Sequence, residues 1–248
     1  MTEEELIAGI QTADKIIEEN SEIYDKKVFE ELNILQTQED NFKDKTINKL
    51  GASEIGNKCA RALYYSYHKE PRKKPESRLV RLFNRGKLEE ARIIAYLRLM
   101  GLDVLPTDNE GRQFFFKDFD DHFQGHCDGL IFHNNEYILL EMKTMNDKSF
   151  TKTDDKGVAE AHPIYYTQMQ VYMGYFGIKQ ALFVSANKNN DDLYFELVNY
   201  DKIEYSSILT KVNDIITCQN IDELPRISTL PSYFECRWCP YRGVCYGV

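Results

Sequence analysis

The sequence predicts an α/β domain in which strands in the middle of the chain are flanked by helices on both sides. The chain has 248 residues with 42% hydrophobic content, which is enough to bury a substantial core. Short apolar runs in its middle are typical of strands, whereas the segments before and after them space their apolar residues as helices do. We therefore expect one α/β core carrying additional segments.

The first predicted helical segment covers residues 3–35, where apolar side chains recur at helical spacing among acids. It forms one amphipathic helix or a pair, and we expect it to be an appended arm. A turn at 51–56, with Ser53 as a candidate cap, leads into the next helix, and residues 69–76 are expected to form a loop. The remaining predicted helices are the one carrying Cys59, Ala62, Leu63 and Tyr64, and those over residues 79–100, 163–177 and 202–217.

Strands are expected over residues 113–117, 123–132, 137–143, 181–186 and 193–198. The second and third are separated by His133-Asn134-Asn135, which predicts a tight hairpin turn. The run from Tyr137 to Leu140 is apolar throughout, which predicts a strand buried on both faces. Residues 146–157 are polar and are expected to be a loop.

Charge is distributed very unevenly along the chain. The formal net charge is -9, but residues 1–45 alone hold thirteen Asp or Glu against five Lys, a net charge of -8. Residues 58–92 hold eleven Lys or Arg against four Glu, a local net charge of +7. This basic stretch could follow a phosphate backbone, and a solvated loop and helix face is an equally good interpretation of the charge alone.

Nothing in the sequence predicts a membrane protein. No run approaches eighteen consecutive apolar residues, and the acidic start, Thr2-Glu3-Glu4-Glu5, differs from the basic and then apolar start of a secretory signal. We expect a soluble, cytoplasmic protein with no membrane partner.

Asp128, Glu141 and Lys143 are the candidate catalytic residues. Asp128 is expected near the end of one strand, and Glu141 and Lys143 at the end of the next, so that the hairpin brings the three together. Strand alternation puts residues 141 and 143 on the same face. Two carboxylates can hold Mg²⁺ or Mn²⁺, and a neighbouring Lys can orient a water and offset phosphate charge, which is the set that phosphodiester hydrolysis needs.

A Glu-x-Lys pair on a strand is by itself more often a surface salt bridge. Here the pair ends an apolar strand, and Gly125 and Gly129 flank Asp128, where glycine is typical of a close approach of the backbone. The context therefore favours the catalytic interpretation.

Gly125-His126-Cys127-Asp128-Gly129 followed by Leu139-Leu140-Glu141-Met142-Lys143 resembles the motif pair of the PD-(D/E)XK nuclease superfamily. Upstream, the segment from Arg85 to Glu90 resembles the superfamily's first-helix motif, in which Glu90 falls at the metal-ligand position. Downstream, Gln168 and Tyr172 resemble the Gln-x-x-x-Tyr motif of the RecB-like branch, and their spacing puts both on one helix face. Taken singly, these residues would be an exposed acid and a polar helix edge.

The resemblance implies a mixed central sheet flanked by helices and an active site with a defined set of roles. Glu90, Asp128 and Glu141 would hold one or two divalent ions, with the Met142 carbonyl as an extra ligand, while Lys143 orients the water and Gln168 positions substrate or water. The expected DNA contacts are Arg61, Tyr65, Arg85 and Tyr172.

Three cysteines, Cys236, Cys239 and Cys245, cluster near the C-terminus, and Cys59 stands far upstream. A structural zinc site, an iron–sulfur cluster, a disulfide and unrelated core thiols are the alternatives, of which an intracellular setting disfavours the disulfide. The spacing resembles the iron–sulfur nucleases, a group that includes CRISPR-associated RecB-like exonucleases and AddB-type nuclease domains. That resemblance implies a [4Fe–4S] cluster joining segments 53–66 and 230–248, with Zn²⁺ as the alternative. Cys127 and Cys218 fall outside the pattern and are expected to be buried thiols.

Together these resemblances imply a nuclease domain over residues 49–248, preceded by an acidic arm over residues 1–48. The implied activity is a metal-dependent DNA exonuclease acting on single strands or duplex ends in recombination, repair or processing, with a recombination or replication protein as a partner. The implied setting is a bacterial cell or a phage-infected host. Glu90 stands where iron–sulfur members commonly have His, as in the lambda-exonuclease-like phage branch, and a carboxylate there favours Mg²⁺. The alternative function is a non-catalytic or zinc-stapled DNA-binding accessory protein.

Overall fold

A five-stranded sheet forms the centre of the computed structural model, which describes residues 1–36, 48–70 and 77–247. Its strand order is β2-β5-β6-β7-β8. The strands are β2 (Asp103–Leu105), β5 (Gly129–His133), β6 (Glu136–Met145), β7 (Gln180–Asn187) and β8 (Leu193–Asn199). Strands β6 and β7 are parallel and the other neighbours are antiparallel. The expected mixed sheet is thus confirmed, as is the hairpin between β5 and β6.

A second, three-stranded sheet lies beside the first in the order β1-β4-β3. Strand β1 (Leu50–Gly51) is parallel to β4 (Phe123–His126), which is antiparallel to β3 (Phe115–Asp118). The prediction of a single strand over residues 123–132 is therefore wrong. The chain leaves the small sheet after His126 and enters the large sheet at Gly129, so Asp128 lies at the crossing between them.

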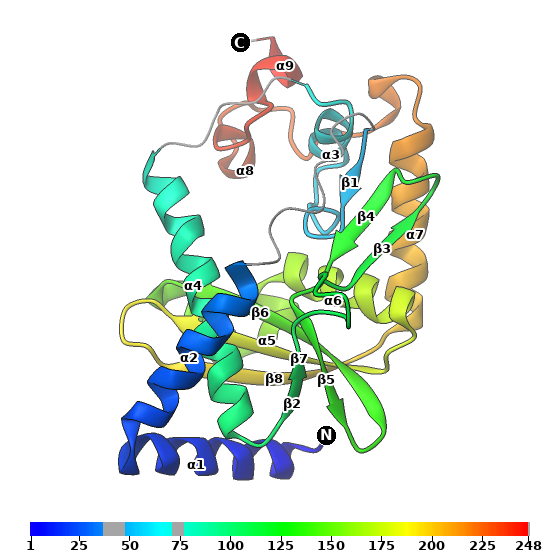
Figure 1. The fold of residues 1–248 in the computed structure, drawn as a ribbon. Helices are drawn as coiled ribbons and strands as arrows, with labels where there is room; N and C mark the ends of the chain where they lie inside the picture. The colour runs from blue at the N-terminus through cyan, green and yellow to red at the C-terminus, as the bar shows by residue number, and fades with distance from the viewer. Residues whose placement is uncertain (37–47, 71–76, 248) are drawn as a thin grey trace.

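Helices cover both faces of the five-stranded sheet (Figure 1). Leu139, Ala181 and Phe183 belong to one core cluster with residues of α5 (Asp147–Ala161), α6 (Pro163–Phe176) and α7 (Lys202–Thr217), of which α7 packs on α6. Leu140 and Leu182, which alternate to the opposite face, pack against α4 (Ser77–Leu99) and α1 (Glu3–Glu19). The burial predicted for the apolar run in β6 is therefore confirmed for Ile138, Leu139 and Leu140, whereas Tyr137 at the start of the run is 51% exposed.

Residues 147–161 form helix α5, so the expectation of a loop at 146–157 is wrong. The Asn146 side chain caps the helix by accepting a hydrogen bond from the Ser149 amide. Phe150, Thr153 and Val158 are buried and provide the helix with an inward face. The polar residues of α5 therefore form the side of the helix that faces solvent.

The acidic N-terminal segment forms a pair of helices, α1 and α2 (Ser21–Gln36), that pack on α4. Glu31 is buried and its carboxylate lies 2.7 Å from Nε of Arg98, and the Tyr96 hydroxyl donates a 2.6 Å hydrogen bond to Asp14. Two acidic side chains of this segment, Asp14 and Glu31, thus have partners on α4. The boundary expected at residues 48/49 adjoins residues 37–47, which lie outside the described residues.

The C-terminal segment lies above the sheets beside α3 (Ala60–Tyr67), whereas the N-terminal helix α1 lies at the opposite end of the molecule (Figure 1). The C-terminal segment contains a 3-10 helix (Ile221–Glu223), α8 (Phe234–Arg237) and α9 (Arg242–Tyr246). Lys211 of α7 holds the turn before Cys59, because its ammonium donates to the carbonyls of Ile55 and Asn57 at 2.7 and 2.6 Å. Within the described ranges, no helix is both long and apolar enough to span a bilayer.

Candidate active site

Asp128, Glu141 and Lys143 lie together at the end of the β5–β6 hairpin. Oδ2 of Asp128 accepts a 2.7 Å hydrogen bond from the Met142 amide, which fixes the carboxylate against β6. The Lys143 ammonium is hydrogen-bonded to Oε1 of Glu141 and lies 3.8 Å from Oδ2 of Asp128. It also donates to the Met142 carbonyl at 3.1 Å. The three residues that the motif pair predicted are therefore neighbours in space.

The pKa values of two carboxyl groups, those of Glu141 and Glu90, are raised by their surroundings. Burial raises the pKa of Glu141 to about 8, with the Lys143 ammonium opposing the rise and the Asp128 carboxylate adding to it. Burial also raises the pKa of Glu90 to about 7, and repulsion from Asp128 contributes. Glu90 of α4 thus belongs to the same electrostatic cluster. Such a group of mutually repelling, partly desolvated carboxylates is expected where positive charge is to be bound.

The donor chemistry of this cluster suits a hard divalent cation. Its members are carboxylate oxygens and one backbone carbonyl, the ligands that Mg²⁺ prefers. Oε2 of Glu141 is fully buried and has no hydrogen-bond partner among the described residues. In the same parts of the chain, no three His, Cys, Asp or Glu side chains are already arranged to hold an ion. The Lys143 ammonium, a cation itself, lies among the carboxylates instead.

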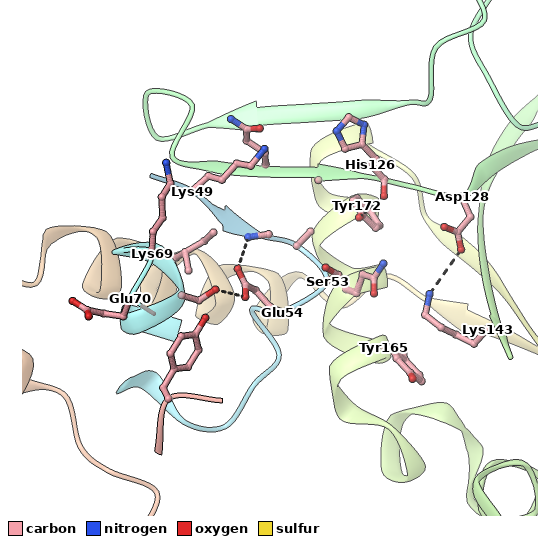
Figure 2. Close-up of a pocket in the computed structure, with 18 residues that line it drawn as sticks. Lys49, Ser53, Glu54, Lys69, Glu70, His126, Asp128, Lys143, Tyr165 and Tyr172 are labelled. Atoms are coloured by element: carbon pink, nitrogen blue, oxygen red, sulfur yellow. Dashed lines mark hydrogen bonds and ion pairs between the residues drawn. The ribbon is translucent and has the colours of Figure 1, made fainter. Parts of the chain in front are cut away.

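A pocket of about 1010 Å³ opens beside these residues (Figure 2). Asp128, Lys143, Gln168 and Tyr172 all line it, so the Gln-x-x-x-Tyr pair faces the predicted site. Tyr165 lies three residues before Gln168 on α6, and the Lys143 ammonium lies 5.3 Å from the centre of its ring. The structure thus places Asp128, which precedes β5, around one space with the motif residues Lys143 of β6 and Gln168 and Tyr172 of α6.

The pocket continues away from Lys143 to a wall formed by β1 and the turn after it. Glu54 supports this wall, since its carboxylate accepts hydrogen bonds from the Gly51 amide at 3.0 Å and the Ser66 hydroxyl at 2.7 Å (Figure 2). Lys49 and Lys69 lie at this end. A chain of phosphates extending from the Asp128 end would pass toward these ammonium groups.

Both glycines that flank Asp128 are close to other atoms, as predicted. A Cβ on Gly125 would lie 2.6 Å from Cβ of Ala52 and 2.7 Å from Cε1 of Tyr172. A Cβ on Gly129 would lie 3.0 Å from the Leu105 carbonyl oxygen. The backbone on either side of Asp128 is therefore fixed by close packing.

The predicted DNA contacts have mixed placements. Arg61 is buried, and its guanidinium donates to the Leu224 carbonyl at 2.6 Å and to Asp222 at 3.0 Å. Tyr65 is buried against Tyr241, and Tyr172 is 2% exposed and donates a 2.6 Å hydrogen bond to the His126 carbonyl. Arg61 and Tyr65 are therefore engaged in packing within the protein, whereas Tyr172, although buried, also lines the pocket. Arg85 is exposed and donates to the Lys188 carbonyl, whereas residues 71–76 of the basic stretch lie outside the described ranges.

The sequence reasoning missed Tyr165, Glu54, Lys49 and Lys69. Tyr165 had a readable signal, because a residue three positions before Gln168 shares its helix face. Lys69 belongs to the basic stretch 58–92 that could follow a phosphate backbone, but Glu54 and Lys49 had no signal, since nothing local indicates that β1 pairs with β4 and brings its neighbours to the pocket.

The four predicted cluster cysteines meet where the start of α3 lies beside the C-terminal segment. Cys59, Cys236, Cys239 and Cys245 line one cavity of about 20 Å³ and are free thiols. Burial and the neighbouring thiols raise the pKa of Cys239. Four thiols suit zinc or an iron–sulfur cluster. In the structure, however, the four side chains do not have the geometry of a metal site. Cys127 and Cys218 are buried elsewhere, as expected.

Comparison with solved structures finds chains of similar fold. SSO0001 aligns with a TM-score of 0.51 and 18% identity over 91% of this chain and 95% of its own. The alkaline exonuclease LHK-Exo of Laribacter hongkongensis aligns with a TM-score of 0.51 and 20% identity over 68% of this chain and 87% of its own. LHK-Exo in complex with dAMP aligns with a TM-score of 0.50 and 18% identity over the same shares.

At these identities the likeness concerns the fold alone, and it is consistent with the PD-(D/E)XK fold that the motifs predicted. No protein-family model matches the sequence, and no curated protein matches it either.

Proposed function

We propose that this protein is a divalent-metal-dependent deoxyribonuclease, acting as an exonuclease on single strands or duplex ends in DNA recombination, repair or processing. The observation that carries the proposal is the convergence of Asp128, Glu141 and Lys143 at a pocket that Asp128 and Lys143 line, with a buried Glu141 oxygen that has no hydrogen-bond partner among the described residues. A surface salt bridge would not bury its carboxylate completely.

Each residue has a distinct part in the proposed reaction. Glu90, Asp128, Glu141 and the Met142 carbonyl supply oxygen ligands for Mg²⁺ or Mn²⁺. A bound divalent ion would lower the pKa of the attacking water and neutralise charge on the phosphate. The Lys143 ammonium orients the water and donates to a phosphate oxygen, while Gln168 positions the substrate.

DNA is the proposed substrate on two grounds. The fold is shared with an alkaline exonuclease, a protein for which a complex with dAMP exists. Lys49, Lys69 and Lys143 also line a single pocket, and such a row of cations suits a phosphate backbone. We propose Lys49, Lys69 and Arg85 as the backbone contacts in place of the buried Arg61, Tyr65 and Tyr172.

The four clustered cysteines are proposed to hold a structural [4Fe–4S] cluster, with Zn²⁺ as the alternative. Cys59 comes from the start of α3, and the other three come from the last fifteen residues of the sequence. A metal centre there would cross-link the start of α3 to the C-terminal segment and would take no part in catalysis.

The test compares wild type with Lys143→Ala on end-labelled single- and double-stranded DNA in Mg²⁺ or Mn²⁺. Lys179→Ala is the matched control, because Lys179 is an exposed lysine paired with Glu136 far from the pocket. We expect wild type and the control to degrade DNA, and Lys143→Ala to lose about 100-fold or more in rate. Equal degradation by wild type and Lys143→Ala would overturn the assignment. Absence of cleavage by either, with DNA binding retained, would favour a non-catalytic accessory role.

A further inference from the structure

Exposed aromatic rings gather on the C-terminal segment, beside the candidate active site. Phe234 is 73% exposed and Trp238 is 69% exposed, although both belong to residue types that normally bury their rings. They line a pocket of about 670 Å³, of which the opposite wall is the start of α6 with the half-exposed Ile164. We call Phe234, Trp238 and Ile164 the aromatic surface.

This surface is continuous with the candidate active site. Glu54, Tyr165 and Tyr241 line both its pocket and the pocket that contains Asp128 and Lys143. Tyr165 connects the two directly, because its ring also lies 5.3 Å from the Lys143 ammonium. A polymer bound at Lys143 therefore meets Phe234 and Trp238 if it runs along this wall.

The charges around the aromatic surface suit a polyanion. Arg237 places its guanidinium 5.2 Å from the centre of the Trp238 ring, and the exposed Lys58 lines the same pocket. Two carboxylates also lie on this wall. That of Glu54 accepts two hydrogen bonds from the protein, and that of Glu235 lies beside the Tyr233 hydroxyl. The two cations, Arg237 and Lys58, therefore remain next to the exposed rings of the aromatic surface.

We propose that the aromatic surface stacks the unpaired bases of a single DNA strand that runs through the active site, an inference that rests on the proposed nuclease function. Aromatic rings with nearby cations bind single strands because every base has a flat face to stack and every phosphate a charge to neutralise. Bases inside a duplex already stack on their neighbours and cannot offer those faces. The surface therefore selects unpaired DNA, whether a free strand or a frayed end.

The first test measures binding of a labelled oligothymidylate by fluorescence anisotropy in buffer without divalent cations, so that no strand is cut. The variants are Trp238→Ala, Phe234→Ala and Trp238→Phe, with Phe29→Ala as control, because Phe29 is an equally exposed ring on α2, at 66%. We expect each alanine change at the surface to weaken binding about 5- to 10-fold. Trp238→Phe retains most of the affinity, since it keeps a ring, and Phe29→Ala changes nothing.

The second test uses wild-type protein only and so does not depend on the folding of a variant. Trp238 is the single tryptophan of the chain, so the change in intrinsic fluorescence on adding DNA reports on this one ring. We expect a single strand to change the signal, and an abasic strand with the same phosphates, or a blunt duplex, to leave it nearly unchanged. The anisotropy of labelled forms of the same strands is measured in parallel.

Unchanged affinity for oligothymidylate in both alanine variants would overturn the inference. The aromatic surface would then be a candidate binding site for a protein partner. Equal anisotropy for the abasic and base-containing strands would also overturn it. Because neither measurement requires cleavage, a failure here leaves the nuclease assignment standing, and a failure of the Lys143→Ala comparison leaves the binding result standing.

Discussion

The backbone amide of Met142 donates a 2.7 Å hydrogen bond to Oδ2 of Asp128, which joins the crossing between the two sheets to the catalytic end of β6. Asp128→Ala leaves this partly buried amide without its acceptor, so we expect a loss of about 1–2 kcal/mol in the free energy of unfolding. Asp128→Asn keeps an acceptor oxygen and should unfold close to wild type in urea. Equal stability of the alanine variant and wild type would mean that the bond does not position Asp128.

Divalent cations should stabilise the folded protein through the buried carboxylates. At 100 times its dissociation constant, a ligand that binds only the folded state adds about 2.7 kcal/mol. Thermal unfolding with and without Mn²⁺ should therefore show a rise in Tm for wild type that is much smaller in Glu141→Gln and Glu90→Gln. Glu136→Gln is the control, because Glu136 is exposed on the same strand as the buried Glu141. A full rise in Tm in both site variants would place the ion elsewhere.

Gly125 should be intolerant of even one methyl group. The added Cβ would lie 2.6–2.8 Å from side-chain carbons of Ala52, Tyr172 and Phe116, and such overpacking costs about 1–3 kcal/mol. Gly86→Ala in α4 is the matched control, because among the described side chains its Cβ would approach only the Thr144 hydroxyl within 4 Å, at 3.9 Å. That control should gain about 0.5–1 kcal/mol by helix propensity. Chemical denaturation measures both, and a neutral Gly125→Ala would contradict the close packing beside Asp128.

The cysteine cluster should contain a metal in protein purified without oxygen. If it is iron–sulfur, the protein is brown and absorbs near ~400 nm, and Cys59→Ser or Cys239→Ser bleaches it. Those variants should also become sensitive to proteolysis after residue 226, because the C-terminal segment loses its cross-link to α3. Cys218→Ser, a change at a buried thiol outside the cluster, is the control. Colourless protein with stoichiometric zinc selects the zinc alternative, and protein free of both metals rejects the site.

The site was predictable from sequence where its residues sit in local patterns. Strand alternation placed Glu141 and Lys143 on one face, and the hairpin brought them to Asp128. Helical spacing placed Gln168 and Tyr172 on one side of α6. In each case a few residues close together in the sequence determine which way the side chains face, so the sequence pattern predicts their positions.

Features that depend on distant pairing could not be predicted. The strand expected over 123–132 divides because Phe123 pairs with Leu50, and Leu130 with Leu139 of a different sheet. Arg61 looked like a free cation, but Asp222 and the Leu224 carbonyl, more than 160 residues away, bind it. Helix α5 was missed for another reason, since its polar residues concealed the buried face of Phe150, Thr153 and Val158.

Cleavage of end-labelled DNA by wild type and Asp128→Asn, each with and without added Mg²⁺, tests the central claim most directly. Asp128→Asn is the informative variant because it keeps one acceptor oxygen for the Met142 amide while it replaces the charged carboxylate with a neutral amide of the same shape. The account predicts that wild type cuts only with Mg²⁺ and that the equally stable Asp128→Asn is at least about 100-fold slower. Cutting at the wild-type rate by Asp128→Asn, or by wild type with no divalent cation present, would contradict it.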